Sequence, residues 1–100
     1  MSNNQLISVV MSVYNDEKFL SDAIESILKQ SNGDFEFIIV NDGSTDNSAV
    51  IISSFQKLDK RIVFIDRKEN KGLPYSLNES IALAKGKYIA RMDSDDVAVE

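Results

Sequence analysis

Short, mainly apolar runs alternate along the chain with stretches in which apolar residues recur at helical spacing. The runs cover residues 7–13, 35–40, 62–65 and 87–92, and their β-branched side chains are typical of strands covered on both faces. The helical stretches between them cover residues 19–28, 50–58 and 77–84. The pattern therefore predicts the order β-α-β-α-β-α-β.

Residues that favour helix ends lie between these segments. The first two helices are preceded by candidate N-cap residues, namely Asn15, Asp16, Ser44 and Asp46. Pro74 suits the first turn of the third helix, and Gly33 and Gly86 suit the ends of the first and third helices. Spacing assigns three residues to the inner face of the third helix: Leu77, Ile81 and Ala84.

The connections between strands are about twenty residues long, which is enough for a helix and too long for a hairpin. We therefore predict an α/β protein with a Rossmann-like three-layer α/β/α fold. Its parallel four-stranded sheet has right-handed crossovers, strand order 3-2-1-4 and helices on both faces. Strands one and four then meet at the point where strand order reverses. The 100 residues make one domain or part of one.

The amino-acid composition limits the kinds of catalytic and metal site that the chain can form. The chain has no cysteine and no histidine, which excludes disulfides, thiolate or imidazole metal sites and Ser-His-Asp triads. A metal ion must therefore be held by oxygen ligands, which Mg²⁺ and Mn²⁺ prefer. The net charge of −5 argues against nucleic acid as a partner, because backbone phosphates attract basic proteins.

The sequence shows no targeting or membrane-spanning segment. Its first five residues carry no basic cluster, and no apolar run approaches the roughly 18 residues that span a bilayer. We expect a cytoplasmic protein, with membrane association only through segments absent from this sequence.

Polar residues follow every predicted strand. In an open parallel sheet the carboxyl ends of the strands share one edge, and ligands bind there. The residues expected at this edge are Ser12, Tyr14, Asn15, Asp42, Asp66, Arg67, Asp93 and Asp95. So many carboxylates hold a diphosphate only if a divalent cation lies between them and the phosphates. The dinucleotide fingerprint and the P-loop motif are absent, so the pattern predicts a metal-dependent nucleotide or phosphate site.

Each candidate side chain has a second interpretation. Asp93 and Asp95 either share a cation or belong to a solvated acidic turn. Asp42 either accepts a hydrogen bond from a base or belongs to a turn that leads into a helix. Tyr14 either stacks on a planar base or packs on its own loop. Glu17 either contacts the ligand or complements the dipole of the first helix, and the dipole role is favoured.

Two further residues border the same edge. Gly43 would allow a ligand to approach the backbone closely. Lys71 either meets a phosphate or is a solvated loop lysine, and the solvated role is favoured.

Five segments occur in a characteristic order and spacing: Ser8–Asn15, Ala23–Gln30, Phe35–Asp46, Asn70–Gly72 and Ala84–Asp96. Together they resemble the family-two glycosyltransferases, which have the A-type glycosyltransferase fold. The resemblance covers residues 6 to 96, nearly the whole chain. Two positions depart from the family pattern: Ser12 stands where many members carry proline, and Asn41 replaces a frequent first aspartate.

The resemblance implies a nucleotide-sugar site at the carboxyl edge. Ser12 and Tyr14 would lie around the base, and Asp42 would accept from a ring N–H, with uracil as the best-fitting base. Asp93 and Asp95 match the two ends of the family's D-x-D motif. Asp95 would bind Mn²⁺ or Mg²⁺, and Asp93 would contact the ribose, the sugar or the ion. Glu17 is included among the nucleotide-sugar contacts.

The resemblance also implies a reaction. It is the inverting, metal-dependent transfer of a hexosyl group from a UDP-sugar to an unidentified carbohydrate or lipid-linked acceptor, as in polysaccharide biosynthesis. Inverting members carry a general base in the second half of a longer domain, so we expect this base beyond Glu100. Residues 1–100 are then expected to be the N-terminal nucleotide-sugar-binding part of a truncated glycosyltransferase domain. We expect this part to be inactive alone and to self-associate through uncovered apolar surface.

Two other functions fit the same residues. A Mg²⁺-dependent phosphoryl-transfer or receiver-like α/β domain also uses edge aspartates, although such domains place them after early strands and the first strand here ends in Ser12–Tyr14. In a non-catalytic binding domain, the run Asp93–Asp96 would be a solvated turn.

Overall fold

The computed structural model describes residues 7–30, 35–86 and 88–92. Seven elements follow one another in the predicted order: β1 (Ile7–Val13), α1 (Glu17–Gln30), β2 (Phe35–Asp42), α2 (Ser48–Leu58), β3 (Ile62–Arg67), α3 (Leu73–Leu83) and β4 (Tyr88–Arg91). In these ranges, no helix is both long enough and apolar enough to cross a membrane.

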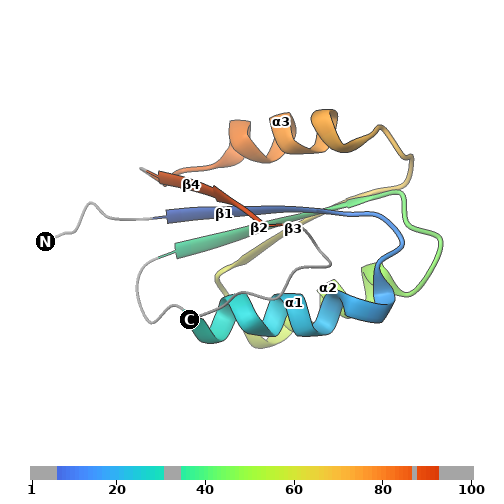
Figure 1. The fold of residues 1–100 in the computed structure, drawn as a ribbon, viewed down its shortest axis with the longest axis horizontal. Coiled ribbons are helices and arrows are strands. Elements are labelled where there is room, and N and C mark those ends of the chain that lie inside the picture. The colour runs from blue at the N-terminus through green and yellow to red at the C-terminus, as the bar shows by residue number, and fades with distance from the viewer. Residues whose placement is uncertain (1–6, 31–34, 87, 93–100) are drawn as a thin grey trace, which may run out of the picture.

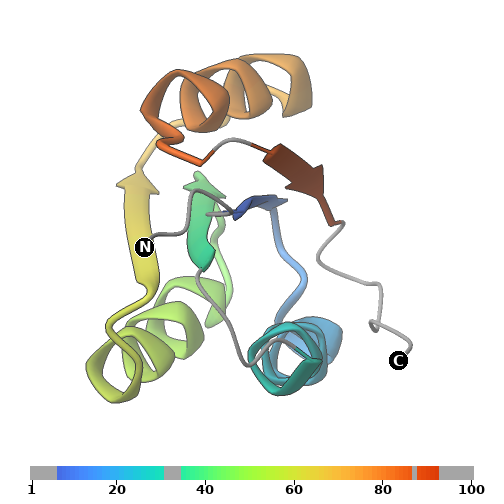
Figure 2. The ribbon, with the colours of Figure 1, turned by 90° about the vertical axis from the view of Figure 1, so that its left-hand side faces the viewer.

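The four strands form one parallel sheet with the order β3-β2-β1-β4. Helices α1 and α2 cover one face of the sheet, and α3 covers the other (Figures 1 and 2). This division follows from right-handed crossovers, because the steps from β1 to β2 and from β2 to β3 run in one direction while the step to β4 runs back. The predicted three-layer fold and its strand order are confirmed.

The main hydrophobic core lies between the sheet and the α1/α2 layer. Helix α1 contributes a buried stripe, and the facing strands contribute side chains at alternate positions. Its buried members are Met11, Val13, Leu20, Ala23, Ile24, Ile27, Phe35, Phe37, Ile39, Ile52 and Ile62. Each large apolar side chain buried here contributes about 1.5–3 kcal/mol through removal of its surface from water.

Helix α3 packs on the sheet with small polar residues at its inner face, so the prediction that Ile81 lies there is wrong, whereas the predicted Leu77 and Ala84 are half-buried. Ser76 and Ser80 are buried, whereas Ile81 is 45% exposed. The Ser80 hydroxyl donates to the Ser76 carbonyl at 2.8 Å, which satisfies its hydrogen-bonding capacity inside the helix. Small side chains with satisfied hydroxyls let the helix lie close to the strands, and Ile81 remains partly exposed to solvent.

The connection from α3 to β4 is anchored at the amino edge of the sheet. The buried Ser8 hydroxyl donates to Glu36 Oε2 (2.5 Å) and accepts from the Gly86 amide (2.8 Å). The Lys85 amide donates to the same Glu36 oxygen at 2.5 Å. These bonds hold the start of β4 beside β1.

Replacement of Ile81 by Ala tests the orientation of α3. We expect Ile81→Ala to lower the free energy of unfolding by less than about 1 kcal/mol, because the side chain is half exposed. Ile52→Ala, in the main core, serves as the control and is expected to cost about 2–5 kcal/mol. Urea denaturation followed by circular dichroism measures both, and equal losses would contradict the observed packing of α3.

Candidate functional site

The carboxyl ends of β1, β2 and β3 lie level with one another. Val13 of β1 is in register with Asn41 of β2, and Asn41 is in register with Asp66 of β3. One residue further on, Asp42 is in register with Arg67. Residues that are far apart in the sequence therefore form one edge, as the predicted topology requires.

Asp42 is the most enclosed acidic group at this edge, with its side chain 3% exposed. Its Oδ1 accepts from Arg67 Nε (3.2 Å) and Nη2 (2.9 Å) and from the Lys71 amide (2.8 Å). Its Oδ2 accepts from the Gly72 amide at 2.9 Å. The carboxylate therefore joins the end of β2 to β3 and to the loop before α3. Its contact with a base stays a prediction, for which Oδ2 retains a lone pair.

Asp42 remains ionised at neutral pH despite its burial. Burial by itself raises the pKa of this carboxyl group. The hydrogen bonds from the Lys71 amide, the Arg67 guanidinium and the Gly72 amide, together with the charge of Arg67, outweigh burial and lower the pKa below its usual value. Asp42 is therefore an acceptor without a proton to donate.

Arg67 connects Asp42 to helix α3. Its side chain is 12% exposed, and its Nη1 donates to Glu79 Oε1 at 2.6 Å. Its Nη2 also donates to the Ser76 hydroxyl, and its Cζ lies 4.8 Å from the centre of the Tyr75 ring. The sequence placed Arg67 at the edge without assigning it a role. The sequence did contain a signal for the ion pair, because Asp42 and Arg67 stand at the ends of two strands predicted to be neighbours.

Gly43 is required by the neighbouring loop. Its φ is +75°, in the left-handed region, and a Cβ atom would lie 2.6 Å from the Asn70 nitrogen and 2.7 Å from the Glu69 carbonyl carbon. Its amide donates to the Arg67 carbonyl at 2.9 Å. The close approach that the sequence suggested for a ligand is therefore made by the backbone of residues 69–70.

Hydrogen bonds between two loops brace the first two helices. The N-cap of α2 is Asn47, not the predicted Ser44 or Asp46, and its side chain makes no cap bond. Asp46, one residue earlier, accepts from the Ser48 amide through Oδ1 at 2.9 Å and from the Glu17 amide through Oδ2 at 3.2 Å. Glu17 Oε1 in turn accepts from the Asn47 amide at 3.0 Å. Asn15, with φ of +52°, accepts from the Thr45 amide at 2.8 Å. The loop after β1 is thereby fixed to the loop after β2.

The other predicted nucleotide contacts lie at or near the same edge. Ser12 is half-buried near the end of β1, and Tyr14 follows the strand with 48% of its surface exposed. Glu17 is exposed on the first turn of α1 and takes part in the brace. Ser12, Tyr14 and Asp42 therefore belong to one edge, with Glu17 at its border. Their contact with a nucleotide stays a prediction.

The predicted metal ligands Asp93 and Asp95 lie outside the described residues. Met92, the last described residue, donates its amide to the Val10 carbonyl in the middle of β1 at 3.0 Å. Within residues 7–30, 35–86 and 88–92, no three acidic side chains come together in a way that would hold a metal ion.

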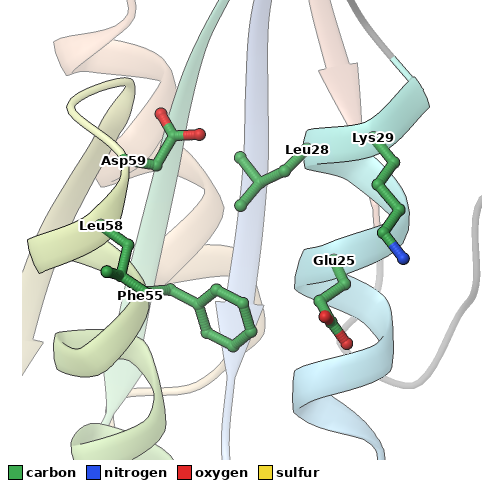
Figure 3. A pocket seen from close by; sticks show the side chains of 6 residues that line it. All are labelled: Glu25, Leu28, Lys29, Phe55, Leu58 and Asp59. Atoms are coloured by element: carbon green, nitrogen blue, oxygen red, sulfur yellow. The ribbon is translucent and has the colours of Figure 1, made fainter.

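A separate hollow of about 220 Å³ lies between α1 and α2. Leu28 and Phe55 project into it from the two helices, and Glu25, Lys29, Leu58 and Asp59 complete its lining (Figure 3). These residues belong to the C-terminal halves of helices that run back along the sheet, so the hollow faces the amino edge. It is remote from Asp42, and the candidate site is the carboxyl edge.

Replacement of Gly43 by Ala tests the packing of the loops at this edge. The left-handed φ alone is expected to cost about 1–3 kcal/mol, and the clash with residues 69–70 adds to it. Gln56→Ala, on the exposed side of α2, is the control and is expected to change stability by less than about 0.5 kcal/mol. Urea denaturation compares the two variants; an unchanged midpoint for Gly43→Ala would refute the close approach.

Comparison with known proteins agrees with this architecture. A family model described as Glycosyl transferase family 2 matches residues 8–99. An uncharacterized glycosyltransferase of Haemophilus influenzae is 44% identical over 98% of this chain and 30% of its own length. A poly(ribitol-phosphate) beta-glucosyltransferase of Bacillus spizizenii is 41% identical over 90% of this chain and 15% of its own length. The chain thus spans less than a third of either relative.

Solved structures share the fold. TarS of Staphylococcus aureus, in complex with UDP-GlcNAc, superposes with a TM-score of 0.83 at 29% identity, covering 91% of this chain and 27% of that one. The mannosyltransferase PcManGT of Pyrobaculum calidifontis, in complex with GDP-Man and Mn²⁺, gives a TM-score of 0.86 at 18% identity. The match covers 94% of this chain and 28% of the mannosyltransferase chain. On the family model and the sequence relatives, this chain belongs to the family 2 glycosyltransferases.

Proposed function

We propose that the carboxyl edge around Asp42 is the donor-nucleotide site of a glycosyltransferase that uses a nucleotide-sugar. The observation that carries this proposal is the enclosed, ionised Asp42 carboxylate, held at the point where β1, β2 and β3 end. The complex of TarS with UDP-GlcNAc supports a nucleotide-sugar as ligand. Family membership favours this function over the phosphoryl-transfer alternative.

The charge of Asp42 limits the bases that fit. A carboxylate only accepts hydrogen bonds, so it pairs with the ring N–H of uracil, thymine or guanine. Cytosine and adenine present an unprotonated ring nitrogen at that position and would leave the carboxylate opposite another acceptor, which is costly in an enclosed site. UDP-sugar is our proposed donor, with the exposed Tyr14 ring available to stack on the base. Ser12 and Glu17 are proposed as further polar contacts.

Asp95 and Asp93 are proposed to hold Mn²⁺ or Mg²⁺ through carboxylate oxygens, the ligands that these ions prefer. The complex of PcManGT, which shares the fold, with GDP-Man and Mn²⁺ supports this assignment. A bound cation would neutralise charge on the leaving diphosphate.

We propose an inverting hexosyl transfer with a general base beyond Glu100, so that residues 1–100 alone give no turnover. The name of the Bacillus spizizenii relative supports a carbohydrate-polymer acceptor.

Calorimetric titration with UDP tests the site. We expect weak binding that strengthens at least about tenfold when Mn²⁺ is added, since the cation screens the diphosphate from the carboxylates. Asp95→Asn is expected to abolish the Mn²⁺ effect, while Asp59→Asn, at the amino edge, leaves it intact. CDP is the matched ligand control and is expected to bind more weakly than UDP. Equal UDP affinities with and without Mn²⁺ would defeat the metal assignment.

Self-association of this chain is proposed through β4, the strand at the edge of the sheet next to β1. Tyr88 and Ile89 on β4 are about half exposed, as are Ile81 and Leu83 on α3. Unpaired strand edges and contiguous apolar residues favour association. Light scattering after gel filtration is expected to show dimers or larger species. Ile89→Lys is expected to reduce their proportion, and the control Val50→Lys, on α2, is expected to leave it unchanged. A strictly monomeric wild-type chain at millimolar concentration would contradict this.

A further inference from the structure

Arg67 ties the edge carboxylate to the rest of the fold. Its guanidinium donates twice to Oδ1 of Asp42. Its other contacts in the described part of the chain are on α3: Glu79, the Ser76 hydroxyl and the face of the Tyr75 ring. Arg67 therefore links Asp42 to side chains of α3, in addition to the amides of Lys71 and Gly72 that hold the same carboxylate just before the helix.

The two oxygens of the Asp42 carboxylate are not equivalent. Oδ1 accepts three hydrogen bonds, two from Arg67 and one from the Lys71 amide, and this saturates it. Among the described residues, Oδ2 accepts from the Gly72 amide alone, which leaves one lone pair for another donor. Without Arg67 the carboxylate would still accept from the Lys71 and Gly72 amides, but it would lose two hydrogen bonds and the contacting positive charge, so burial would favour its protonated form.

We propose that Arg67 is a positioning residue for the donor base: it saturates Oδ1 of Asp42 and, together with the Lys71 and Gly72 amides, fixes the carboxylate plane, so that Oδ2 accepts the ring N–H of the base. This inference rests on the proposed function. Arg67 acts through Asp42 and makes no contact with the nucleotide. A lysine would keep the charge, but a single ammonium group does not reproduce the two-pronged contact of the guanidinium.

Other charged groups surround Asp42 in the described part of the chain. Glu79 on α3 reaches it only through Arg67, and Asp66 on β3 accepts from the Asn41 amide group at 2.9 Å. The Lys71 ammonium lies over the Tyr75 ring, 5.3 Å from its centre. Arg67 is therefore the cation in direct contact with Asp42, and its removal is expected to act on that carboxylate first.

Carbon-13 NMR titration of the Asp42 carboxyl group tests the hold of Arg67. In Arg67→Gln the titration midpoint is expected to rise by about one pH unit, because a contacting opposite charge is lost. Arg67→Lys is expected to move it much less. Arg61→Gln is the matched control, since Arg61 also donates twice to an aspartate, through Nε to Oδ1 and Nη2 to Oδ2 of Asp59, at the other end of β3. An unmoved midpoint in Arg67→Gln would overturn the proposal.

Calorimetry with UDP and CDP then tests the role in base selection. In Arg67→Gln we expect UDP affinity to fall at least about tenfold. We also expect the ratio of UDP affinity to CDP affinity to approach one, because a protonated or rotated carboxyl group no longer selects a ring N–H. Arg61→Gln is expected to leave both the UDP affinity and the preference for UDP over CDP unchanged. A purely structural role of Arg67 would weaken UDP and CDP alike and leave their ratio unchanged, which counts against the proposal.

Two further results separate this inference from the proposed function. If the wild-type chain binds no UDP, the proposed function fails and, with it, the role of Arg67 in base selection. A midpoint shift in the NMR titration then still shows that Arg67 holds Asp42. If Arg67→Gln does not fold, Arg67→Lys decides, since it keeps the charge but loses the paired contact. A full UDP preference in a folded Arg67→Lys variant would overturn the claim that the fixed carboxylate plane matters.

Discussion

The ion pair between Asp42 and Arg67 organises the functional edge of this protein. A carboxylate enclosed to this degree is stable only with partners that satisfy it. Its partners come from β3 and from the loop before α3. Because those partners must converge on one group, the loop passes close to the turn after β2, and only glycine fits at position 43. The backbone geometry of the edge therefore follows from the need to keep one charge buried and paired.

The two faces of the sheet are stabilised by different means. The face toward α1 and α2 is a continuous apolar core. The face toward α3 carries the buried apolar side chains of Val10, Ile38 and Val40, and polar anchors add to them: Arg67 holds the start of the helix, and Ser8 with Glu36 holds the chain after its end. Ser76 and Ser80 fill the space between. An element docked by directional contacts has a better-defined position than one docked by apolar area alone, and α3 borders the proposed nucleotide site.

The loops after β1 and β2 are joined by side-chain caps that cross from one helix to the other. Asp46 accepts amides from both α1 and α2, so the orphan N–H groups of two helix starts share one carboxylate. Tyr14, which follows β1, and the loop that follows Asp42 at the end of β2 therefore cannot move independently. Such coupling supports a site in which one loop offers a ring for stacking and the other an acceptor for the base edge.

The amino-acid sequence by itself determined the order of elements, the parallel sheet, the strand order and the edge where the polar residues gather. Alternation of apolar runs and helical spacing encodes these features locally, and chirality restricts how the segments connect. Only the tertiary structure decided that Ser80 and not Ile81 faces the sheet, because α3 is apolar on more than one side and its packing depends on Arg67 and on close approach. Only it showed that Asp42 is held by Arg67 and that Glu17 belongs to a brace between two loops. Those contacts join residues 25 to 30 positions apart, and no local periodicity records them.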